Sequence, residues 1–376
     1  MSFRTIISYI LWPLTIWYAI GVAVRNFIYS VGLKKQEAPH ITTIGVGNLS
    51  TGGTGKTPHV EYLLRLLSDK YPTAMLSRGY KRKSKGYQAD DGSHDPQLLG
   101  DEPAMIARKF PQVQVAVCEN RMEGVKRLME SPIVSESTED TEEQEVPETQ
   151  SAPQLIILDD VFQHRSIKPS INILLTEYGN PYYRDRILPY GNLREPRSAR
   201  YRAGIVIVTK CPAILNPIGK HNIINDLRLQ NYQKVFFSYL KYGALTDLEG
   251  RPADINLRQQ ENVLVVTGIA NPAPLLNEIR RRCKAQHLAF EDHHAYNRQD
   301  IARIRDTFAA LPGTRKIIIT TEKDAIRLHG LVNDLPVYIQ PIEVAFHKDN
   351  NLDFDQVIES SVRENISFLH KLSIWS

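Results

Sequence analysis

Cysteine is scarce in this sequence of 376 residues. Only Cys118, Cys211 and Cys283 are present, far apart in the chain and odd in number. This spacing excludes a disulfide framework and shows no pattern of metal ligands. We therefore expect the folded part of the chain to occupy a reducing, cytosolic compartment.

Long uncharged runs are also nearly absent, apart from residues 5–24 near the N-terminus. A helix of about twenty residues spans about 30 Å, close to the thickness of a hydrocarbon core. Pro13 predicts a kink or an early end of this helix, and the lack of a clear cleavage site disfavours a signal peptide. Aromatic residues that favour membrane interfaces lie in the run: Trp12, Trp17 and Tyr18. We expect residues 1–30 to form a membrane-associated helix that spans the bilayer or lies in its interface; a buried core helix is the alternative.

Strong net charge is lacking too, since the formal value is only +4. Seven acidic residues between Glu136 and Glu148, with no Lys or Arg among them, mask a basic remainder of +11. Such a remainder suits phosphate groups or an anionic membrane surface. Charge alone is equally consistent with nucleic acid, although the motifs below lead us to expect no nucleic-acid partner. The acidic tract at 135–152 has almost no apolar residues, which predicts a mobile insertion.

Apolar strand patterns alternate with helical patterns along most of the chain. The first six predicted strands lie at residues 38–48, 73–77, 113–117, 154–160, 171–177 and 203–210. This alternation predicts a parallel sheet with right-handed crossovers, and the length favours two domains. We expect an α/β protein, with a P-loop NTPase-type sheet in residues 38–235 and a smaller α/β domain in residues 236–376.

A glycine-dense segment follows the first predicted strand and precedes an apolar helical pattern. It comprises Ser50, Thr51, Gly52, Gly53, Thr54, Gly55, Lys56 and Thr57. Backbone N–H groups of such a loop bind phosphate oxygens at a helix N-terminus. Lys56 would reach the β- and γ-phosphates, and Thr57 would ligate Mg²⁺. The strict motif has glycine where this chain has Ser50, and an ordinary glycine-rich turn is the alternative.

A pair of acidic residues, Asp159 and Asp160, ends the apolar strand at 154–160. The carboxyl ends of parallel strands meet at the edge of the sheet where such folds bind ligands. We therefore expect one or both carboxylates to hold Mg²⁺, directly or through water. Capping of a following helix is the alternative. Guanine recognition is disfavoured, because the nearest match to its usual motif has Pro212 in place of the aspartate, so ATP is the expected nucleotide.

Nine segments together resemble the tetraacyldisaccharide 4′-kinases, which phosphorylate the disaccharide precursor of lipid A. They are VGNLSTGGTGKTP (46–58), SRGYKR (77–82), GDEP (100–103), ENR (119–121), ILDDVFQH (157–164), LPYGNLREP (188–196), TKCP (209–212), FEDHHAY (290–296) and TEKDA (321–325). They occur in the family's order and cover residues 40 to 325. Two departures are the acidic insertion and Val161, which stands where Gly or Ala is more usual.

The resemblance implies a catalytic dyad formed by Asp101 and His293. A sugar hydroxyl is a poor nucleophile, so a carboxylate within hydrogen-bond reach can remove its proton. From the residues alone, Asp101 reads as a helix N-cap, and other residues beside His293 compete for its role: Glu291, Asp292 and His294. Glu102 is a further candidate ligand of Mg²⁺.

The same motifs supply candidates for binding the lipid acceptor. Arg78, Arg121 and Arg194 are expected to pair with phosphate, and Tyr80 to contact the sugar. His164 or Asp160 is an alternative group for proton transfer. The resemblance also implies a place at the inner, cytoplasmic membrane with the active site facing the cytosol.

Two other functions share the phosphate loop. A P-loop ATPase could couple hydrolysis to protein or metal delivery at the membrane. A non-catalytic membrane tether would bind ATP without turnover. Neither needs the expected acceptor-binding residues.

Overall fold

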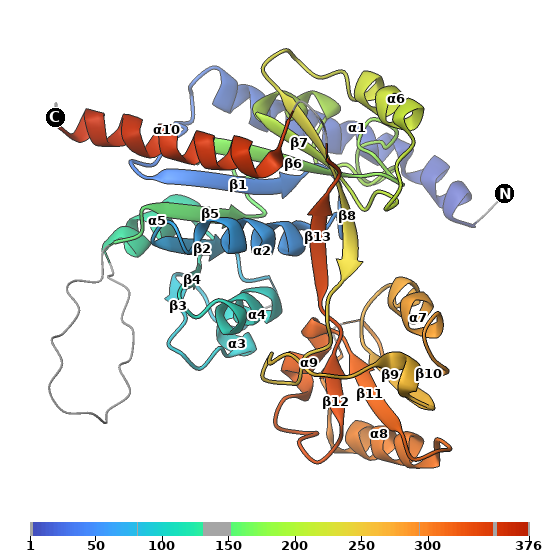
Figure 1. Cartoon of the computed structure of the whole chain (residues 1–376). Coiled ribbons are helices and arrows are strands. Elements are labelled where there is room, and N and C mark those ends of the chain that lie inside the picture. The colour runs from blue at the N-terminus through green and yellow to red at the C-terminus, as the bar shows by residue number, and fades with distance from the viewer. Residues whose placement is uncertain (1–2, 81, 131–151, 293, 349–351, 375–376) are drawn as a thin grey trace, which may run out of the picture. The chain divides into compact units, whose positions relative to one another are not determined.

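The computed structural model describes residues 3–80, 82–130, 152–292, 294–348 and 352–374 (Figure 1). The acidic insertion expected at 135–152 lies outside the described residues except for Ala152, and so does His293. The chain forms two compact units. The larger contains Met1–Leu240 and Val344–Ser376, and the smaller contains Lys241–Glu343.

A nine-stranded sheet forms the centre of the larger unit. Its strands are β1 (Thr42–Asn48), β2 (Thr73–Ser77), β3 (Gln88–Ala89), β4 (Gln114–Val117), β5 (Leu155–Asp159), β6 (Ile171–Glu177), β7 (Ile205–Thr209), β8 (Lys234–Tyr242) and β13 (Ile342–Phe346). They lie in the order β13-β8-β7-β6-β1-β5-β2-β4-β3. The pairs from β4 to β8 along this order are parallel, and only the β3–β4 pair is described as antiparallel. The predicted parallel sheet is confirmed.

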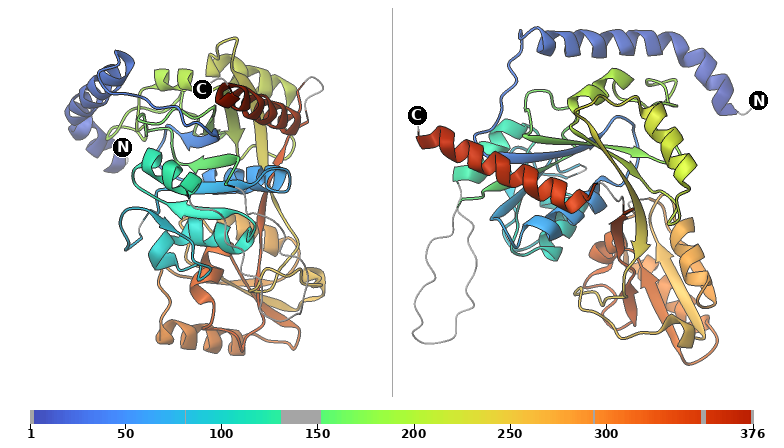
Figure 2. Two further views of the ribbon diagram at one scale, coloured as in Figure 1. Left: turned by 90° about the vertical axis from the view of Figure 1, so that its left-hand side faces the viewer. Right: turned by 45° about the horizontal axis from the view of Figure 1, so that its top comes forward.

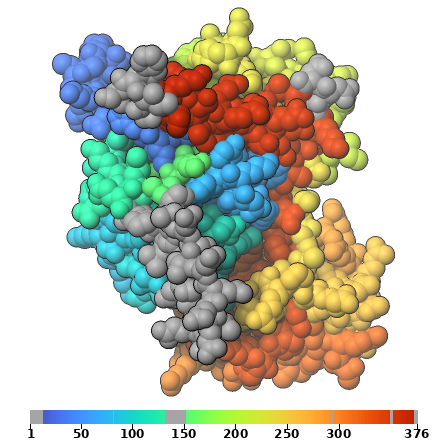
Figure 3. Space-filling model, turned by 60° about the vertical axis from the view of Figure 1, so that its left-hand side comes forward, coloured from blue at the N-terminus to red at the C-terminus, as the bar shows by residue number. Residues whose placement is uncertain are grey.

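Helices follow the strands of this sheet as the alternating pattern predicts. They are α1 (Phe3–Ser30), α2 (Lys56–Leu67), α3 (Pro96–Leu99), α4 (Asp101–Lys109), α5 (Arg121–Glu130), α6 (Pro217–Leu227), α10 (Phe354–Ile374) and a 3₁₀ helix, Arg197–Arg202. The apolar residues of α2 recur at helical spacing, and Val60, Leu63 and Leu64 are fully buried against the sheet. Tyr62 donates a hydrogen bond of 2.7 Å to Asp355 of α10, and Figure 3 shows the two helices side by side.

The predicted C-terminal boundary of the second domain is wrong. After Glu343 the chain returns to the larger unit, where β13 lies beside β8. The buried face of α10, which includes Phe354, Ile358 and Val362, shares a core with β1, and Figure 2 shows this helix running across the sheet. An amphipathic pattern shows that a helix buries one face, but it does not show which of two cores receives it.

The smaller unit is built around its own four-stranded sheet. The strands are β9 (Asn262–Thr267), β10 (Ala285–Ala289), β11 (Lys316–Thr320) and β12 (Val337–Ile339), all parallel and ordered β10-β9-β11-β12. Its helices are α7 (Ala273–Arg280), α8 (Arg298–Ala310), α9 (Glu322–Leu328) and a 3₁₀ helix, Leu257–Gln259. Buried aliphatic residues of these strands and helices, such as Leu264, Ile304 and Ile318, form its core.

The N-terminal helix α1 continues through Pro13 rather than ending there. None of the helices in the described ranges combines the length and the hydrophobicity that crossing a bilayer requires. The spanning form of the expected N-terminal helix is therefore not supported. The helix is fastened to the larger unit, because Arg25 pairs at 2.8 Å with the fully buried carboxylate of Glu195.

Candidate active site

The glycine-dense loop lies between the carboxyl end of β1 and the start of α2. Among the hydrogen bonds that hold it, Asn48 Nδ2 donates to Thr54 Oγ1 at 2.8 Å, Thr209 Oγ1 donates to Thr54 O at 2.8 Å, and Thr51 N donates to Asn192 O at 2.7 Å. A Cβ placed on Gly52 or Gly53 would meet no described atom within 4 Å. The loop is thus fixed at both sides and leaves open space at its centre.

Asp160 brings two cations together at the end of β5, the strand next to β1. Its Oδ1 lies 3.8 Å from Lys56 Nζ. Arg194 donates to both carboxylate oxygens, at 2.9 and 3.2 Å. Burial alone would raise the pKa of Asp160, but the bond from Arg194 and the charge of Lys56 hold that pKa below its usual value. Asp160 is therefore an anion whose partners are the cations expected to bind phosphate.

Asp159 has a different environment from its neighbour. It is buried, Ser77 Oγ donates to its Oδ2 at 3.2 Å, and its Oδ1 has no hydrogen-bond partner in the described part of the chain. Burial and the charges of Glu102 and Asp160 raise its pKa to about 6. An unpartnered buried carboxylate oxygen is costly unless a cation or donor binds it. This oxygen fits a Mg²⁺ ligand.

Carboxylates alone do not build a complete metal site here. No group of three or more His, Cys, Asp or Glu side chains in the described ranges is arranged to hold a metal ion. Mg²⁺ usually binds one or two carboxylates together with substrate phosphates and waters. The donors present therefore suit Mg²⁺ that arrives with a nucleotide.

Arg121 was expected to contact the acceptor, but its side chain is buried, with only 1% of the residue exposed. Its guanidinium donates to the backbone carbonyls of Cys118 and Asp159, the latter at 3.0 Å. Burial lowers its pKa to about 10. These contacts hold the end of β5 in place.

Three further candidates are Arg78, His164 and Tyr80. The positive charge of Arg78 contributes to lowering the pKa of both Arg121 and His164, so these three side chains lie close together. Burial and these two arginines lower the pKa of His164 to about 4, so its ring is neutral at pH 7. Tyr80 is 76% exposed, and a Cβ on Gly100 would lie 3.0 Å from its carbonyl oxygen. The segment bearing Arg78 and Tyr80 therefore contacts the residue before Asp101.

Asp101 and Glu102 open helix α4. The N-cap is Gly100, so Asp101 does not cap the helix as the alternative interpretation had it. The negative charge of Glu102 helps to raise the pKa of Asp159. The first turn of α4 therefore lies close to the aspartate pair. Asp101 thus begins an element that meets the predicted metal site.

The second member of the expected dyad, His293, lies outside the described residues. Its neighbour His294 is held within the smaller unit, where its Nε2 lies 2.9 Å from Asp300 Oδ2. The ring of His294 also packs against Phe290 and Tyr296. These contacts make His294 a structural residue of that loop.

Several residues that shape the site were not singled out from the sequence. Asn48 accepts a hydrogen bond from Arg194 and donates to Thr54, so it connects the two sides of the site. Ser77 orients Asp159, and Asn192 holds the phosphate loop. All three stand inside the quoted motifs, which was the available signal. Their roles depend on contacts between distant segments, which sequence spacing does not give.

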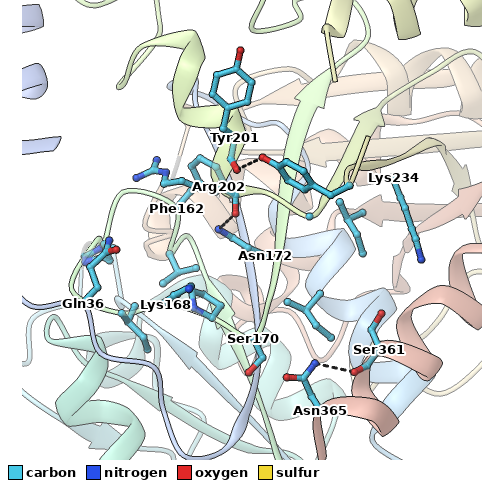
Figure 4. Close-up of a pocket in the computed structure, with 18 of the residues that line it drawn as sticks. Gln36, Phe162, Lys168, Ser170, Asn172, Tyr201, Arg202, Lys234, Ser361 and Asn365 are labelled. Carbon is cyan, nitrogen blue, oxygen red and sulfur yellow. Dashed lines mark hydrogen bonds between the residues drawn. The ribbon is translucent and has the colours of Figure 1, made fainter. Parts of the chain in front are cut away.

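A separate hollow of about 530 Å³ opens near the amino ends of several strands of the sheet (Figure 4). It is lined by residues at the beginnings of β6, β7 and β8, such as Asn172 and Lys234, and by residues that follow the aspartate pair, including Phe162 and His164. Nucleotides bind at the carboxyl ends of strands in open α/β sheets. Residues 50–57 of the phosphate loop are not among those that line the hollow, although the candidate site residue His164 is.

Comparison with known proteins gives a consistent result. The family model for tetraacyldisaccharide-1-P 4′-kinase (LpxK) matches residues 7–363. Tetraacyldisaccharide 4′-kinase of Phocaeicola vulgatus is 41% identical over 364 residues, covering 94% of this chain and 95% of the relative. The enzyme of the same name from Parabacteroides distasonis is 40% identical over 368 residues, covering 95% of each.

A solved structure agrees with the sequence comparisons. LpxK from Aquifex aeolicus, crystallised in complex with ATP, superposes with a TM-score of 0.72 at 26% identity. The match covers 95% of this chain and 99% of that chain. The chain belongs to the tetraacyldisaccharide-1-P 4′-kinase family, and it is an ATP-dependent kinase of the lipid A pathway.

Proposed function

We propose that the residues around the phosphate loop transfer the γ-phosphate of ATP to the 4′-hydroxyl of a tetraacyldisaccharide 1-phosphate. The observation that carries the proposal is the convergence of Lys56 and Arg194 on Asp160, at the carboxyl ends of neighbouring strands. Phosphate oxygens, like the carboxylate oxygens of Asp160, carry negative charge that both cations attract. ATP bound at residues 50–57 would place its terminal phosphates beside this cluster.

The metal would be held by oxygen donors from three elements. Thr57 offers a hydroxyl at the start of α2, and Asp159 offers the unpartnered Oδ1. Asp160 and Glu102 are the further candidates. Bound Mg²⁺ neutralises charge that develops on the transferred phosphoryl group. Ser77 and Arg121 fix Asp159 through its side chain and backbone, respectively.

Proton removal from the acceptor is assigned to Asp101. It lies at the beginning of α4, next to Glu102, whose charge already acts on Asp159. A carboxylate near the metal can accept the hydroxyl proton as the new bond to phosphorus forms. His293 is proposed as its partner on the family's pattern alone. His164, whose pKa is lowered to about 4 by burial and by the charges of Arg121 and Arg78, would be a neutral imidazole at pH 7 and is the alternative group for proton transfer.

An apolar groove beside Arg194 supports a lipid acceptor. The groove measures about 670 Å³ and lies between α1 and the segment before Arg194. Apolar side chains from both sides line it, including Ile16, Ala19, Ile187 and Leu193. Because Leu193 adjoins Arg194, an acyl chain in this groove would place its sugar near the phosphate cluster.

The exposed face of α1 supports attachment to the inner membrane from the cytosolic side. Trp17, Val24 and Phe27 are 74%, 52% and 63% exposed. Large apolar side chains grouped on one helix favour the boundary between headgroups and acyl chains. We propose that α1 lies in this interface and that the lipid reaches the groove from the bilayer.

The test is phosphate transfer from γ-³²P-labelled ATP into a chloroform-extractable lipid, with a disaccharide 1-phosphate as acceptor. We expect wild-type protein to label the lipid and Lys56→Met to lose at least about 100-fold in rate, because the positioned cation is removed. Label that appears only as inorganic phosphate, with lipid present, would favour the ATPase alternative. Full activity of Lys56→Met would reject the proposed phosphate loop.

A further inference from the structure

His59 is a buried residue that the proposed chemistry does not use. It lies in the first turn of α2, four residues after Gly55, and only 3% of it is exposed. Both ring nitrogens have partners: Nδ1 lies 2.7 Å from Gly55 O, and Nε2 lies 2.9 Å from Ser238 Oγ. These two bonds tie the imidazole to the phosphate loop on one side and to β8 on the other.

The chemistry of the two partners fixes the tautomer. A carbonyl oxygen only accepts, so the proton of the neutral ring must be on Nδ1. Nε2 is then an acceptor, and the Ser238 hydroxyl donates to it. Burial lowers the pKa of His59 to about 4, and the ring is therefore neutral at pH 7. The result is a directed chain of hydrogen bonds from Ser238 through His59 to Gly55.

Holding the Gly55 carbonyl determines where the next N–H points. The peptide unit is planar and trans, so the C=O of Gly55 and the N–H of Lys56 point in opposite directions. Gly55 has φ +88°, a region open mainly to glycine, and its carbonyl also accepts from His59 N at 3.2 Å. With that carbonyl directed into the helix, the N–H of Lys56 is directed out of the helix N-terminus, where phosphate would bind.

The far side of the ring is anchored on the strands that connect the two units. Ser238 is buried on β8, and its carbonyl accepts from Cys211 N at 2.9 Å. Phe346, on β13, meets the His59 ring edge to face with centroids 6.2 Å apart. β8 carries the chain out of the larger unit and β13 carries it back. On this side the imidazole is therefore held by residues of the sheet rather than of a loop.

We propose that His59 is a positioning residue for ATP, which fixes the Gly55–Lys56 peptide toward the triphosphate from an anchor on Ser238. This inference rests on the proposed phosphate loop. A core histidine with no such role would support folding only. The two possibilities differ in whether substitutions change the affinity for ATP or only the thermal stability.

Three substitutions at this position separate the two bonds. The amide nitrogen of His59→Asn reaches the place of Nδ1 and keeps a donor for Gly55 O. The longer His59→Gln reaches the place of Nε2, which keeps a partner for Ser238 but no donor for Gly55. His59→Leu removes both bonds at similar volume. We expect Leu and Gln to raise the KM for ATP about tenfold, as for one lost hydrogen bond in a binding site, and Asn to restore most of the affinity.

The KM for the lipid acceptor and the kcat are measured on the same proteins, together with Tm. We expect the KM for the lipid to stay near the wild-type value, because the Gly55–Lys56 peptide faces the nucleotide. If Leu and Gln lower Tm but leave the KM for ATP unchanged, the inference is wrong. If Leu does not fold, the comparison of Gln with Asn decides. Loss of activity in Lys56→Met with an unchanged KM for ATP in His59→Gln would reject this inference alone, whereas an active Lys56→Met would reject the phosphate loop itself.

Discussion

Arg194 binds Asp160 through both amino groups of its guanidinium, with Nη2–Oδ1 at 2.9 Å and Nη1–Oδ2 at 3.2 Å. The same guanidinium donates to Asn48 at the end of β1. One side chain therefore joins the strand that precedes the phosphate loop to the aspartate pair on the neighbouring strand. A planar fork of donors suits this task, and a lysine ammonium does not reproduce it.

Replacement of Arg194 should damage turnover more than nucleotide binding. We expect Arg194→Lys to reduce kcat by about 10- to 100-fold, because a point charge cannot bind two acceptors in one plane. Arg184, which is exposed and pairs with Asp226 only at 3.8 Å, offers a matched control as Arg184→Lys. Steady-state kinetics with both substrates checks this expectation. Equal kcat values for the two variants would contradict it.

Substitution of Asp101 should remove the proposed base. We expect Asp101→Asn to lower kcat by about 10²- to 10⁴-fold with little change in the KM for ATP. Glu102→Gln is the comparison variant at the neighbouring position. Because Glu102 is a candidate ligand of Mg²⁺, this substitution should instead raise the Mg²⁺ concentration needed for half-maximal rate. Near-normal turnover of Asp101→Asn at saturating substrates would show that another group takes the proton.

The buried imidazole of His59 predicts a pH dependence of stability. Its pKa is about 4 in the fold and about 6.5 in an unfolded chain. Between these values the unfolded chain binds more protons, so the free energy of unfolding falls as pH decreases. The contribution is complete above about pH 6.5 and lost by about pH 4, and it amounts to about 3 kcal/mol.

Urea unfolding at a series of pH values measures this contribution. Between pH 7 and pH 4, wild-type protein should lose about 3 kcal/mol more than His59→Asn, whose amide does not titrate. His164, whose pKa is also lowered, is present in both proteins, so it cancels in the comparison. Parallel pH profiles for the two proteins would mean that His59 is not buried in the neutral form.

The exposed face of α1 predicts binding to lipid vesicles. We expect the double substitution Trp17→Ser and Phe27→Ser to weaken co-sedimentation with anionic vesicles by about tenfold or more, because two large apolar groups no longer enter the interface. Ile214→Ser is the control, since Ile214 is 91% exposed but lies outside α1. Activity toward bilayer-embedded lipid should fall more than activity toward detergent-dispersed lipid. An equal loss toward both forms would assign these residues to the fold instead.

Local patterns predicted much of the fold. The Val60, Leu63 and Leu64 spacing predicts α2, and the apolar run ending at Asp159 predicts β5, because both features depend on neighbours in sequence. The return of residues 344–376 to the larger unit was missed, since pairing of β13 with β8 joins segments about a hundred residues apart.

The site shows the same division. Lys56, Asp159 and Asp160 follow from motifs with known physical roles. The burial of Arg121 does not, because a motif gives the residue type but not its exposure. Asn48, Ser77 and His59 act through hydrogen bonds to distant segments, and no local pattern distinguishes them from ordinary polar residues.

The most direct test of the central claim is a crystal structure of the protein with Mg²⁺ and a non-hydrolysable ATP analogue. We expect the β- and γ-phosphates to lie against Lys56 Nζ and the N–H groups of the loop, with the metal between Thr57 and Asp159. Lys56 should then leave Asp160, from which it lies 3.8 Å away in this structure. Triphosphate bound at any other place, with Lys56 still paired to Asp160, would contradict the account.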